Sequence, residues 1–140
     1  MTHGRFIGGA PFFAVGFRFA ECSGRVWFLA DTGASRSVLL DRDAGLLRVS
    51  GAALEPAKGT IVGIGGSVRP FVAPGSELTL ISDEGYLVFH QEMYVVQHDL
   101  ALLPPDEVAR VLKLPSILGR DILNRFRFTC DYQSVNFRVF

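Results

Sequence analysis

An aspartate directly follows a run of large apolar side chains, and this position is suited to acid–base chemistry. The segment VWFLA (26–30) is typical of a buried strand, and Asp31, Thr32 and Gly33 come immediately after it. A carboxylate at the end of such a strand is costly to desolvate unless it is hydrogen-bonded or shares a proton with another acid. A carboxyl group in that environment can serve as a general acid or base. The alternative interpretation is a turn aspartate that accepts a hydrogen bond from its own backbone.

Two glycine-containing stretches are the other unusual features. GTIVGIGGSV (59–68) places glycines inside an otherwise β-branched apolar hairpin, where glycine normally only weakens a strand. SILGRDIL (116–123) places Gly119 between two apolar residues and a helix-like segment. We expect the first stretch to bend or to lie close to another backbone, and Gly119 to let a second chain segment pass nearby. An ordinary tight turn is the alternative for the first stretch; a phosphate loop fits poorly because no Lys-Ser/Thr pair follows.

The elements that must position these residues are mostly short strands. Gly, Pro, Asp and Ser interrupt the apolar runs about every ten residues, a spacing typical of an all-β sandwich or barrel. The predicted strands cover residues 11–19, 25–30, 37–40, 59–64, 67–72, 77–82 and 86–96. A last hairpin is predicted to turn at DYQS (131–134), with Val135, Phe137 and Val139 on one face of its final arm.

Two short helices are predicted beside the strands. In LLPPDEVARVLKL (102–114), Pro105 suits a first helical turn, and the acids after it suit the positive end of the helix dipole. A shorter helix is predicted within GRDILNRF (119–126). The sequence shows no internal repeat and no linker, so we expect a single domain over residues 1–140.

Composition restricts the classes of function. Apolar residues make up 49% of the chain, and 14 Lys and Arg balance 14 Asp and Glu, with no basic run that would favour nucleic acid as a partner. No apolar stretch reaches the length of a membrane span and no secretory signal is evident, so we expect a cytoplasmic protein without stable membrane insertion. Cys22 and Cys130 are expected to be free thiols, outside any Cys-x-x-Cys motif. His90 and His98 are too sparse for a zinc site and are expected to be surface or structural residues.

Taken in order, three stretches of the sequence resemble the retropepsin-like aspartic peptidases, the single-domain relatives of the retroviral proteases. LADTGAS (29–35) matches the catalytic loop of that family, and IVGIGG (61–66) looks like its glycine-rich flap tip. ILGRDIL (117–123) is similar to the apolar-apolar-Gly element that crosses behind the catalytic loop. The resemblance implies an all-β fold, a closed acid-protease β-barrel with one or two short helices, which acts as a homodimer.

The resemblance also implies a mechanism. A chain of 140 residues with one Asp-Thr-Gly would need the second acid of the site from a second copy, on a two-fold axis. The two copies of Asp31 would share one proton and titrate as a unit. The ionised copy would activate a water molecule and the protonated one would polarise the scissile carbonyl. The implied activity is therefore that of an aspartic endopeptidase, with a polypeptide substrate and without a metal or other cofactor.

Further site roles follow from the same resemblance. Thr32 would hold the dimer centre through its hydroxyl, and Gly33 would meet the substrate backbone. An extended substrate would pair with the flap as an added strand. The implied substrate-binding residues are Ala34, Ile61, Gly63, Ile64, Gly65, Gly66 and Ile117. For Ile117, packing in the core is an equally good interpretation.

The sequence departs from the viral pattern in three places. Viral enzymes pair the Arg after the glycine element with an Asp four residues after the catalytic one, but here Ser35 stands at that position, so Arg120 needs another partner or faces solvent. Ala34 provides no hydroxyl for the acid, which predicts a working range less acidic than that of pepsin. The insertion 97–114 is longer than in the viral enzymes and is expected to cover an edge or to alter the dimer contact.

Other interpretations remain open at this point. A catalytically silent dimerisation or peptide-binding module with the same fold is the main alternative, although the intact Asp-Thr-Gly favours an enzyme. A serine hydrolase is less well supported, since Ser67 lacks the Gly-x-Ser-x-Gly elbow. The remaining acids near the motifs, Asp121 and Asp131, are expected to be solvated or to cap backbone groups.

Overall fold

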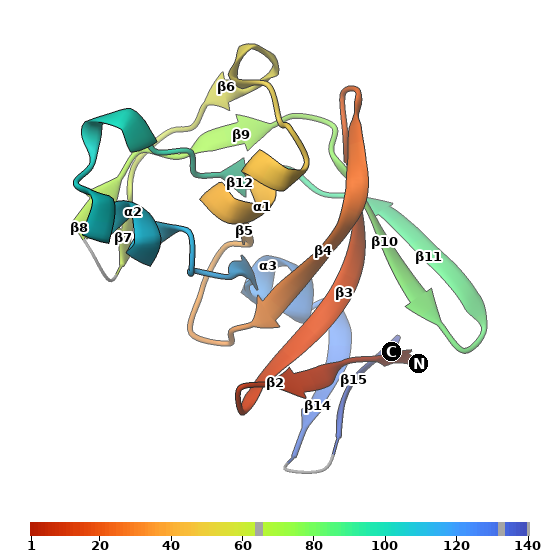
Figure 1. The fold of residues 1–140 in the computed structure, drawn as a ribbon. Coiled ribbons are helices and arrows are strands. Elements are labelled where there is room, and N and C mark those ends of the chain that lie inside the picture. The colour runs from red at the N-terminus through yellow and green to blue at the C-terminus, as the bar shows by residue number, and fades with distance from the viewer. Residues whose placement is uncertain (64–65, 132–133, 140) are drawn as a thin grey trace.

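Strands make up most of the fold (Figure 1), in a computed structural model that describes residues 1–63, 66–131 and 134–139. The strands are β1 (Thr2–His3), β2 (Arg5–Ile7), β3 (Ala10–Phe19), β4 (Cys22–Ala30), β5 (Val38–Leu39), β6 (Glu55–Pro56), β7 (Ile61–Gly63), β8 (Gly66–Val68), β9 (Phe71–Ala73), β10 (Glu77–Ser82), β11 (Gly85–His90), β12 (Met93–Val95), β13 (Ser116–Leu118), β14 (Phe126–Cys130) and β15 (Val135–Val139). The helices are α1 (Asp41–Leu46), α2 (Pro105–Val111) and α3 (Arg120–Leu123), with 3₁₀ turns η1 (Gly51–Ala53) and η2 (Leu100–Leu102). The all-β class with short helices is confirmed.

The main sheet is open at both ends. Its strands follow the order β11-β10-β3-β4-β13-β5-β12-β9-β6, with β2 paired to β3. Within the described residues the end strands β11 and β6 do not pair, so the expectation of a closed barrel is wrong. Closure needs two end strands long enough to pair along a common tilt. The two-residue strand β6 cannot supply such an edge, because Pro56 has no N–H to donate.

The central strands form where the apolar alternation is strongest. In β3, Phe13, Val15, Phe17 and Phe19 are buried while the residues between them are more exposed, and β4 repeats the pattern with Val26, Phe28 and Ala30. The two strands pair antiparallel along their length, from Phe12 opposite Leu29 to Phe19 opposite Cys22. The predicted hairpin of residues 11–19 and 25–30 is therefore confirmed, with β4 starting three residues earlier than predicted.

Two predicted strands are each divided in the structure. Residues 67–72 are split between β8 and β9 at Pro70, which has no N–H for a ladder and whose carbonyl accepts a hydrogen bond from Ala57. Residues 86–96 are split between β11 and β12 at Gln91, which is buried and donates its backbone N–H to Ser76 O at 3.0 Å. At both positions the backbone forms a hydrogen bond with a distant segment, and the pairing of the preceding strand ends there.

The helices are found where predicted, with one addition. Helix α2 lies within residues 102–114 with Pro105 in its first turn, and α3 lies within residues 119–126. Helix α1 is not predicted by the sequence, because its residues DRDAGL lack an apolar period. Asp41 and Asp43 in this helix are nevertheless buried, since both are held by hydrogen bonds from distant segments.

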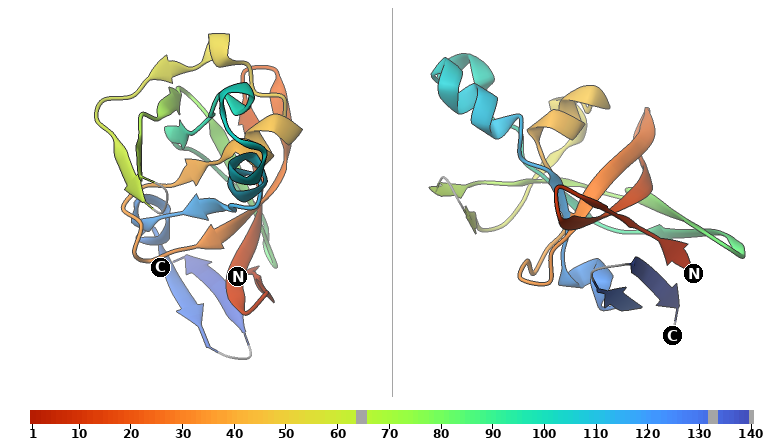
Figure 2. Two further views of the ribbon diagram at one scale, coloured as in Figure 1. Left: turned by 60° about the vertical axis from the view of Figure 1, so that its left-hand side comes forward. Right: turned by 60° about the horizontal axis from the view of Figure 1, so that its bottom comes forward.

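An aromatic cluster joins the small sheet β1-β15-β14 to the main sheet. Phe137 of β15 is 1% exposed and stacks on Phe13 of β3, with ring centroids 3.7 Å apart, and on Phe126 at 5.3 Å. Full burial of one such side chain stabilises the fold by about 1.5–3 kcal/mol. Both ends of the chain lie at this small sheet (Figure 2), because β1 pairs antiparallel with β15.

The last hairpin has the predicted form where it is described. Val135 and Phe137 are buried, while Asn136 is half-buried and Arg138 exposed, which confirms the alternation up to residue 138. At the turn, Ser134 N donates to Asp131 Oδ1 at 2.8 Å, so the capping role expected for Asp131 is confirmed. No helix of the described residues is long and apolar enough to cross a bilayer.

Candidate active site

The main chain of β13 fixes the position of Asp31. Strand β4 pairs in parallel with β13, with Ala30 opposite Leu118, and then runs directly into Asp31. The backbone N–H of Asp31 donates to Leu118 O at 3.0 Å, which extends the ladder one residue beyond the strand. Asp31 thus starts its loop from a rigid position at the edge of the core.

The carboxylate of Asp31 is half-buried and oriented by its own loop. Gly33 N donates to Asp31 Oδ1 at 2.8 Å, and Ala34 N donates to Asp31 O at 3.2 Å. The turn geometry that was the alternative interpretation of this aspartate is therefore present. It does not compete with a chemical role, because the same hydrogen bond sets the direction of a carboxylate that is still partly accessible.

Gly119 lies where two chain segments cross. A Cβ atom at this position would lie 2.6 Å from Arg36 O and 2.8 Å from Ala34 O, far inside van der Waals contact. The backbone of Gly119 is extended, with φ −97°, so lack of space and not backbone conformation requires the glycine. Arg120 N donates to Ala34 O at 2.8 Å directly after the crossing. The expectation that Gly119 lets a second segment pass closely is confirmed.

Arg120 has a partner in the same loop. Its Nη1 donates to Thr32 O at 2.9 Å, so the guanidinium contacts the backbone of the loop in place of the carboxylate that the sequence lacks at Ser35. The side chain of Thr32 is exposed beside it. Arg36, two residues before the next strand, lies over the ring of Tyr94 at 5.5 Å. These contacts leave Asp31, Thr32 and Gly33 at the surface of a braced loop.

Of the two roles expected for Asp121, solvation is wrong, and a hydrogen bond to a backbone group is found. Asp121 is half-buried in α3, and its carboxylate accepts hydrogen bonds from Ser37 N at 3.0 Å and Ser37 Oγ at 2.6 Å. Ser37 is 1% exposed and its Oγ also accepts from Gly119 N at 2.9 Å. No local signal in the sequence identifies Ser37 as a partner of Asp121, because 84 residues separate the two.

The predicted substrate-binding residues are partly described. Ile117 in β13 is half-buried and faces Leu29 and Val38 in the strands on either side. In the flap stretch, β7 and β8 form a hairpin with Ile61 opposite Val68 and Gly63 opposite Gly66. Ile64 and Gly65 lie outside the described residues. Figure 1 shows this hairpin on the same side of the molecule as α2.

The insertion 97–114 is anchored to α1. His98 donates its backbone N–H to Asp41 Oδ1 at 2.6 Å, and its Nδ1 lies 2.8 Å from Asp41 Oδ2. The structural role expected for His98 is confirmed by these contacts. Beyond the anchor, η2 and α2 follow, and Leu102, the last residue of η2, is 80% exposed.

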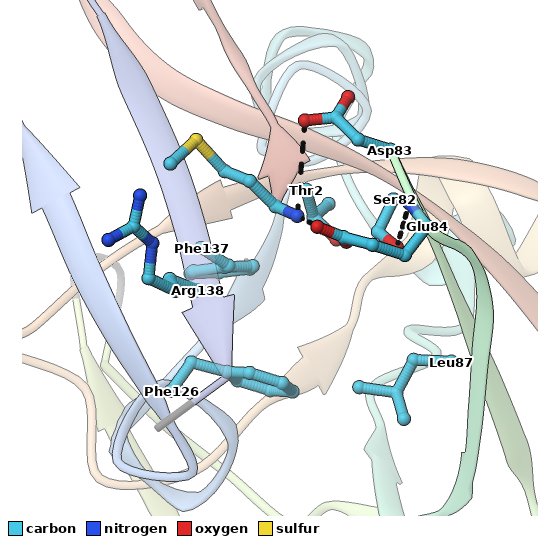
Figure 3. Close-up of a pocket in the computed structure, with 9 residues that line it drawn as sticks. Thr2, Ser82, Asp83, Glu84, Leu87, Phe126, Phe137 and Arg138 are labelled. Carbon is cyan, nitrogen blue, oxygen red and sulfur yellow. Dashed lines mark hydrogen bonds and ion pairs between the residues drawn. The ribbon is translucent and has the colours of Figure 1, made fainter.

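A cavity at the small sheet lies apart from the Asp31 loop. Its volume is ≈ 560 Å³. Figure 3 shows that acids of the β10–β11 turn face it from one side and aromatic rings from the other. Its lining residues are Met1, Thr2, Ser82, Asp83, Glu84, Leu87, Phe126, Phe137 and Arg138.

The acids of this cavity already have partners. The ammonium group of Met1 lies 2.7 Å from Glu84 Oε2, and this hydrogen bond, together with its positive charge, lowers the pKa of Glu84. His3 Nε2 lies 3.0 Å from Asp83 Oδ2. Among the described residues, no cluster of three or more His, Cys, Asp or Glu side chains is arranged to hold a metal ion. Cys22 and Cys130 are both free thiols.

Comparison with known proteins defines the fold. No family model matches the sequence, and no curated protein matches it. Among solved structures, a retropepsin-like aspartic protease from Rickettsia conorii matches with a TM-score of 0.56 and 22% identity, over 98% of this chain and 88% of the other. The EIAV protease, solved in complex with the inhibitor HBY-793, matches with a TM-score of 0.53 and 23% identity, over 86% of this chain and 90% of the other. The chain therefore has a retropepsin-like fold, shared with solved aspartic proteases.

Proposed function

We propose that this protein is an aspartic endopeptidase whose active site is completed by a second copy of the chain. The observation that carries the proposal is the setting of Asp31. It stands at the end of a buried strand, with a partly accessible carboxylate oriented by Gly33 N at 2.8 Å, on a loop that crosses Gly119. The fold shared with solved aspartic proteases supports the same assignment.

In the proposed reaction, two copies of Asp31 share one proton. The ionised carboxylate takes a proton from a bound water molecule, and the water oxygen attacks the scissile carbonyl carbon. The protonated carboxyl of the other copy gives its proton to the carbonyl oxygen, which forms a tetrahedral diol. As the diol collapses, one of its hydroxyls returns a proton to the ionised carboxylate, the C–N bond breaks, and the leaving amine takes the proton of the other carboxyl, so the pair again holds one proton. Two acids a few ångströms apart favour this shared state, because they cannot easily both ionise.

The surrounding residues have proposed roles in binding. The exposed Thr32 would meet its counterpart at the two-fold axis, and Gly33 would face the substrate backbone. The hairpin from Ile61 to Gly66 would pair with an extended polypeptide. Ala34 and the half-buried Ile117 would line the floor beneath the substrate side chains.

Replacing Asp31 with asparagine tests the proposal. Asparagine keeps the shape of the side chain and the acceptor for Gly33 N, but it removes the shared proton. We expect the rate of cleavage of a denatured protein mixture, followed by mass spectrometry of new peptide ends, to fall by about 1,000-fold or more. We expect sedimentation to show the same dimer in both forms, and activity per mole to fall on dilution.

Asp99→Asn is a matched control for this experiment. Asp99 also accepts a hydrogen bond from the backbone N–H two residues ahead, with Ala101 N at 3.2 Å from its Oδ1, but it lies in the insertion. We expect this variant to cleave at the wild-type rate. A dimer that cleaves nothing in the wild-type form, over a range of pH and concentration, would instead identify a silent dimerisation or peptide-binding module.

A further inference from the structure

Two buried serines at the starts of neighbouring strands are hydrogen-bonded in the same way. Ser37, directly before β5, donates its Oγ–H to Asp121 Oδ1 at 2.6 Å and accepts from Gly119 N at 2.9 Å. Ser116, the first residue of β13, donates its Oγ–H to Asp43 Oδ2 at 2.6 Å and accepts from Leu40 N at 2.9 Å. Their exposed fractions are 1% and 0%.

The two arrangements are reciprocal. Each serine accepts a hydrogen bond from the residue that follows the other strand, and donates one to an aspartate in the helix after that strand. The sequences SVLL (37–40) and SILG (116–119) are equivalent in this sense, although they are too short to be noticed as a repeat. Strands β5 and β13 are adjacent in the sheet, with Val38 opposite Ile117. We refer to the pairs as the Ser37–Asp121 latch and the Ser116–Asp43 latch.

The two latches hold different parts of the chain. The Ser37–Asp121 latch lies at the end of the loop that begins at Asp31. It attaches that end to Gly119, where the two segments of the chain cross. The Ser116–Asp43 latch holds the far end of β5, where α1 begins. The hydrogen bonds of this latch, from Leu40 N and to Asp43, involve no residue of the loop 31–36. The same arrangement of hydrogen bonds therefore occurs once at the candidate active site and once away from it.

In the Ser37–Asp121 latch, the Asp121 side chain is the acceptor of each hydrogen bond. Oδ1 of Asp121 accepts from Ser37 Oγ, and Oδ2 accepts from Ser37 N at 3.0 Å and from Gln91 Nε2 at 3.3 Å. Gln91 is oriented by Arg125, whose Nη2 donates to Gln91 Oε1 at 2.8 Å. The two carboxylate oxygens therefore accept from three donor groups. An asparagine would replace one acceptor oxygen with an NH₂ group, so either that group would face the donors Ser37 N and Gln91 Nε2, or the Ser37 hydroxyl would have to reverse its hydrogen bond.

We infer that Ser37 and Asp121 are positioning residues of the candidate active site, which clamp the loop 31–37 against Gly119 and so fix the direction of the Asp31 carboxylate. The catalytic part of this inference rests on the proposed function. Removing the Ser37 hydroxyl leaves the buried N–H of Gly119 without its acceptor, and relief requires the crossing segments to move. Removing the Ser116 hydroxyl leaves Leu40 N without its acceptor in the same way, but in that case α1, and not the crossing segments, would have to move.

Ser37→Ala and Ser116→Ala therefore form a matched pair. We expect both to lower the melting temperature by a similar amount. Only Ser37→Ala should speed amide exchange of Asp31 and Arg120, whose N–H groups bond Leu118 O and Ala34 O, by about tenfold relative to amides of the β3–β4 hairpin. Only Ser37→Ala should lower kcat, by about 10- to 100-fold per active site titrated with a transition-state inhibitor. Ser37→Thr, which keeps the hydroxyl, should restore both values.

The outcomes separate the inference from the proposed function. Equal effects of the two alanine variants on exchange and on kcat would overturn the inference, because the latch would then be merely structural. If wild-type protein shows no cleavage, the proposed function fails, and the exchange of Asp31 and Arg120 in Ser37→Ala decides the positioning role alone. If Ser37→Ala does not fold, Asp121→Ala, which removes the acceptor of these hydrogen bonds, takes its place, and unchanged exchange and kcat in that variant would overturn the inference.

Discussion

Replacing Gly119 with alanine is expected to lower the melting temperature and to slow cleavage. The new Cβ would lie 2.6 Å from Arg36 O, 2.7 Å from Arg36 C and 2.8 Å from Ala34 O. These are backbone atoms, so no side-chain rotation can relieve the contacts. Alanine tolerates the extended backbone at this position, with φ −97° and ψ −172°, so the cost is entirely steric.

The magnitude follows from these distances. Ordinary contact begins at 3.4 Å, so the segments must separate by about 0.8 Å at the closest atom. Overpacking of this kind costs about 1–3 kcal/mol, and three contacts with backbone favour the upper value. With an unfolding entropy of about 0.3 kcal/mol/K for a chain of this size, a loss of about 3 kcal/mol lowers the melting temperature by about 10 °C. Displacement of the Asp31 loop by this distance should reduce kcat by up to about 100-fold.

Gly45→Ala provides the control for thermal unfolding measured by circular dichroism. Gly45 lies in α1, and a Cβ there would meet nothing within 4 Å. Alanine is a better helix former than glycine by about 0.5–1 kcal/mol, so this variant should melt about 2–3 °C higher than wild type. A Gly119→Ala protein that melts within about 2 °C of wild type and cleaves normally would refute the steric argument.

Two further substitutions test the loop and the core. Gly33→Ala would place a Cβ 3.1 Å from Asp31 Oδ1, and the Asp31 side chain can relieve this close contact by moving a few tenths of an ångström. We expect about a tenfold loss of kcat, with less than about 1 kcal/mol lost from the free energy of unfolding measured in urea. A fully active variant would contradict this expectation. Phe137→Ala should lower the free energy of unfolding by about 3–5 kcal/mol in the same assay, because the ring is 1% exposed and stacked on Phe13. A loss below about 1 kcal/mol would show that the aromatic cluster does not hold the small sheet.

Features that depend on local pattern could be predicted from the amino-acid sequence. Alternating apolar residues located β3, β4 and β10, and Pro105 with the acids after it located α2. The same local logic placed Asp31 at the end of a buried strand and identified Gly119 as a point of close approach. These predictions succeed because side-chain period, proline and glycine act within a few residues of where they stand.

Features that depend on which strands are neighbours could not be predicted in this way, because they are set by long-range contacts. The open sheet order, the division of residues 86–96 at Gln91 and the helix α1 follow from contacts with distant segments. The clearest cases are the two latches, whose serine and aspartate lie 84 and 73 residues apart. Their geometry arises because β5 and β13 lie side by side, so that a buried hydroxyl at the start of one strand reaches the backbone and helix after the other. No local propensity encodes that adjacency, because it is set by the packing of the whole sheet around its core.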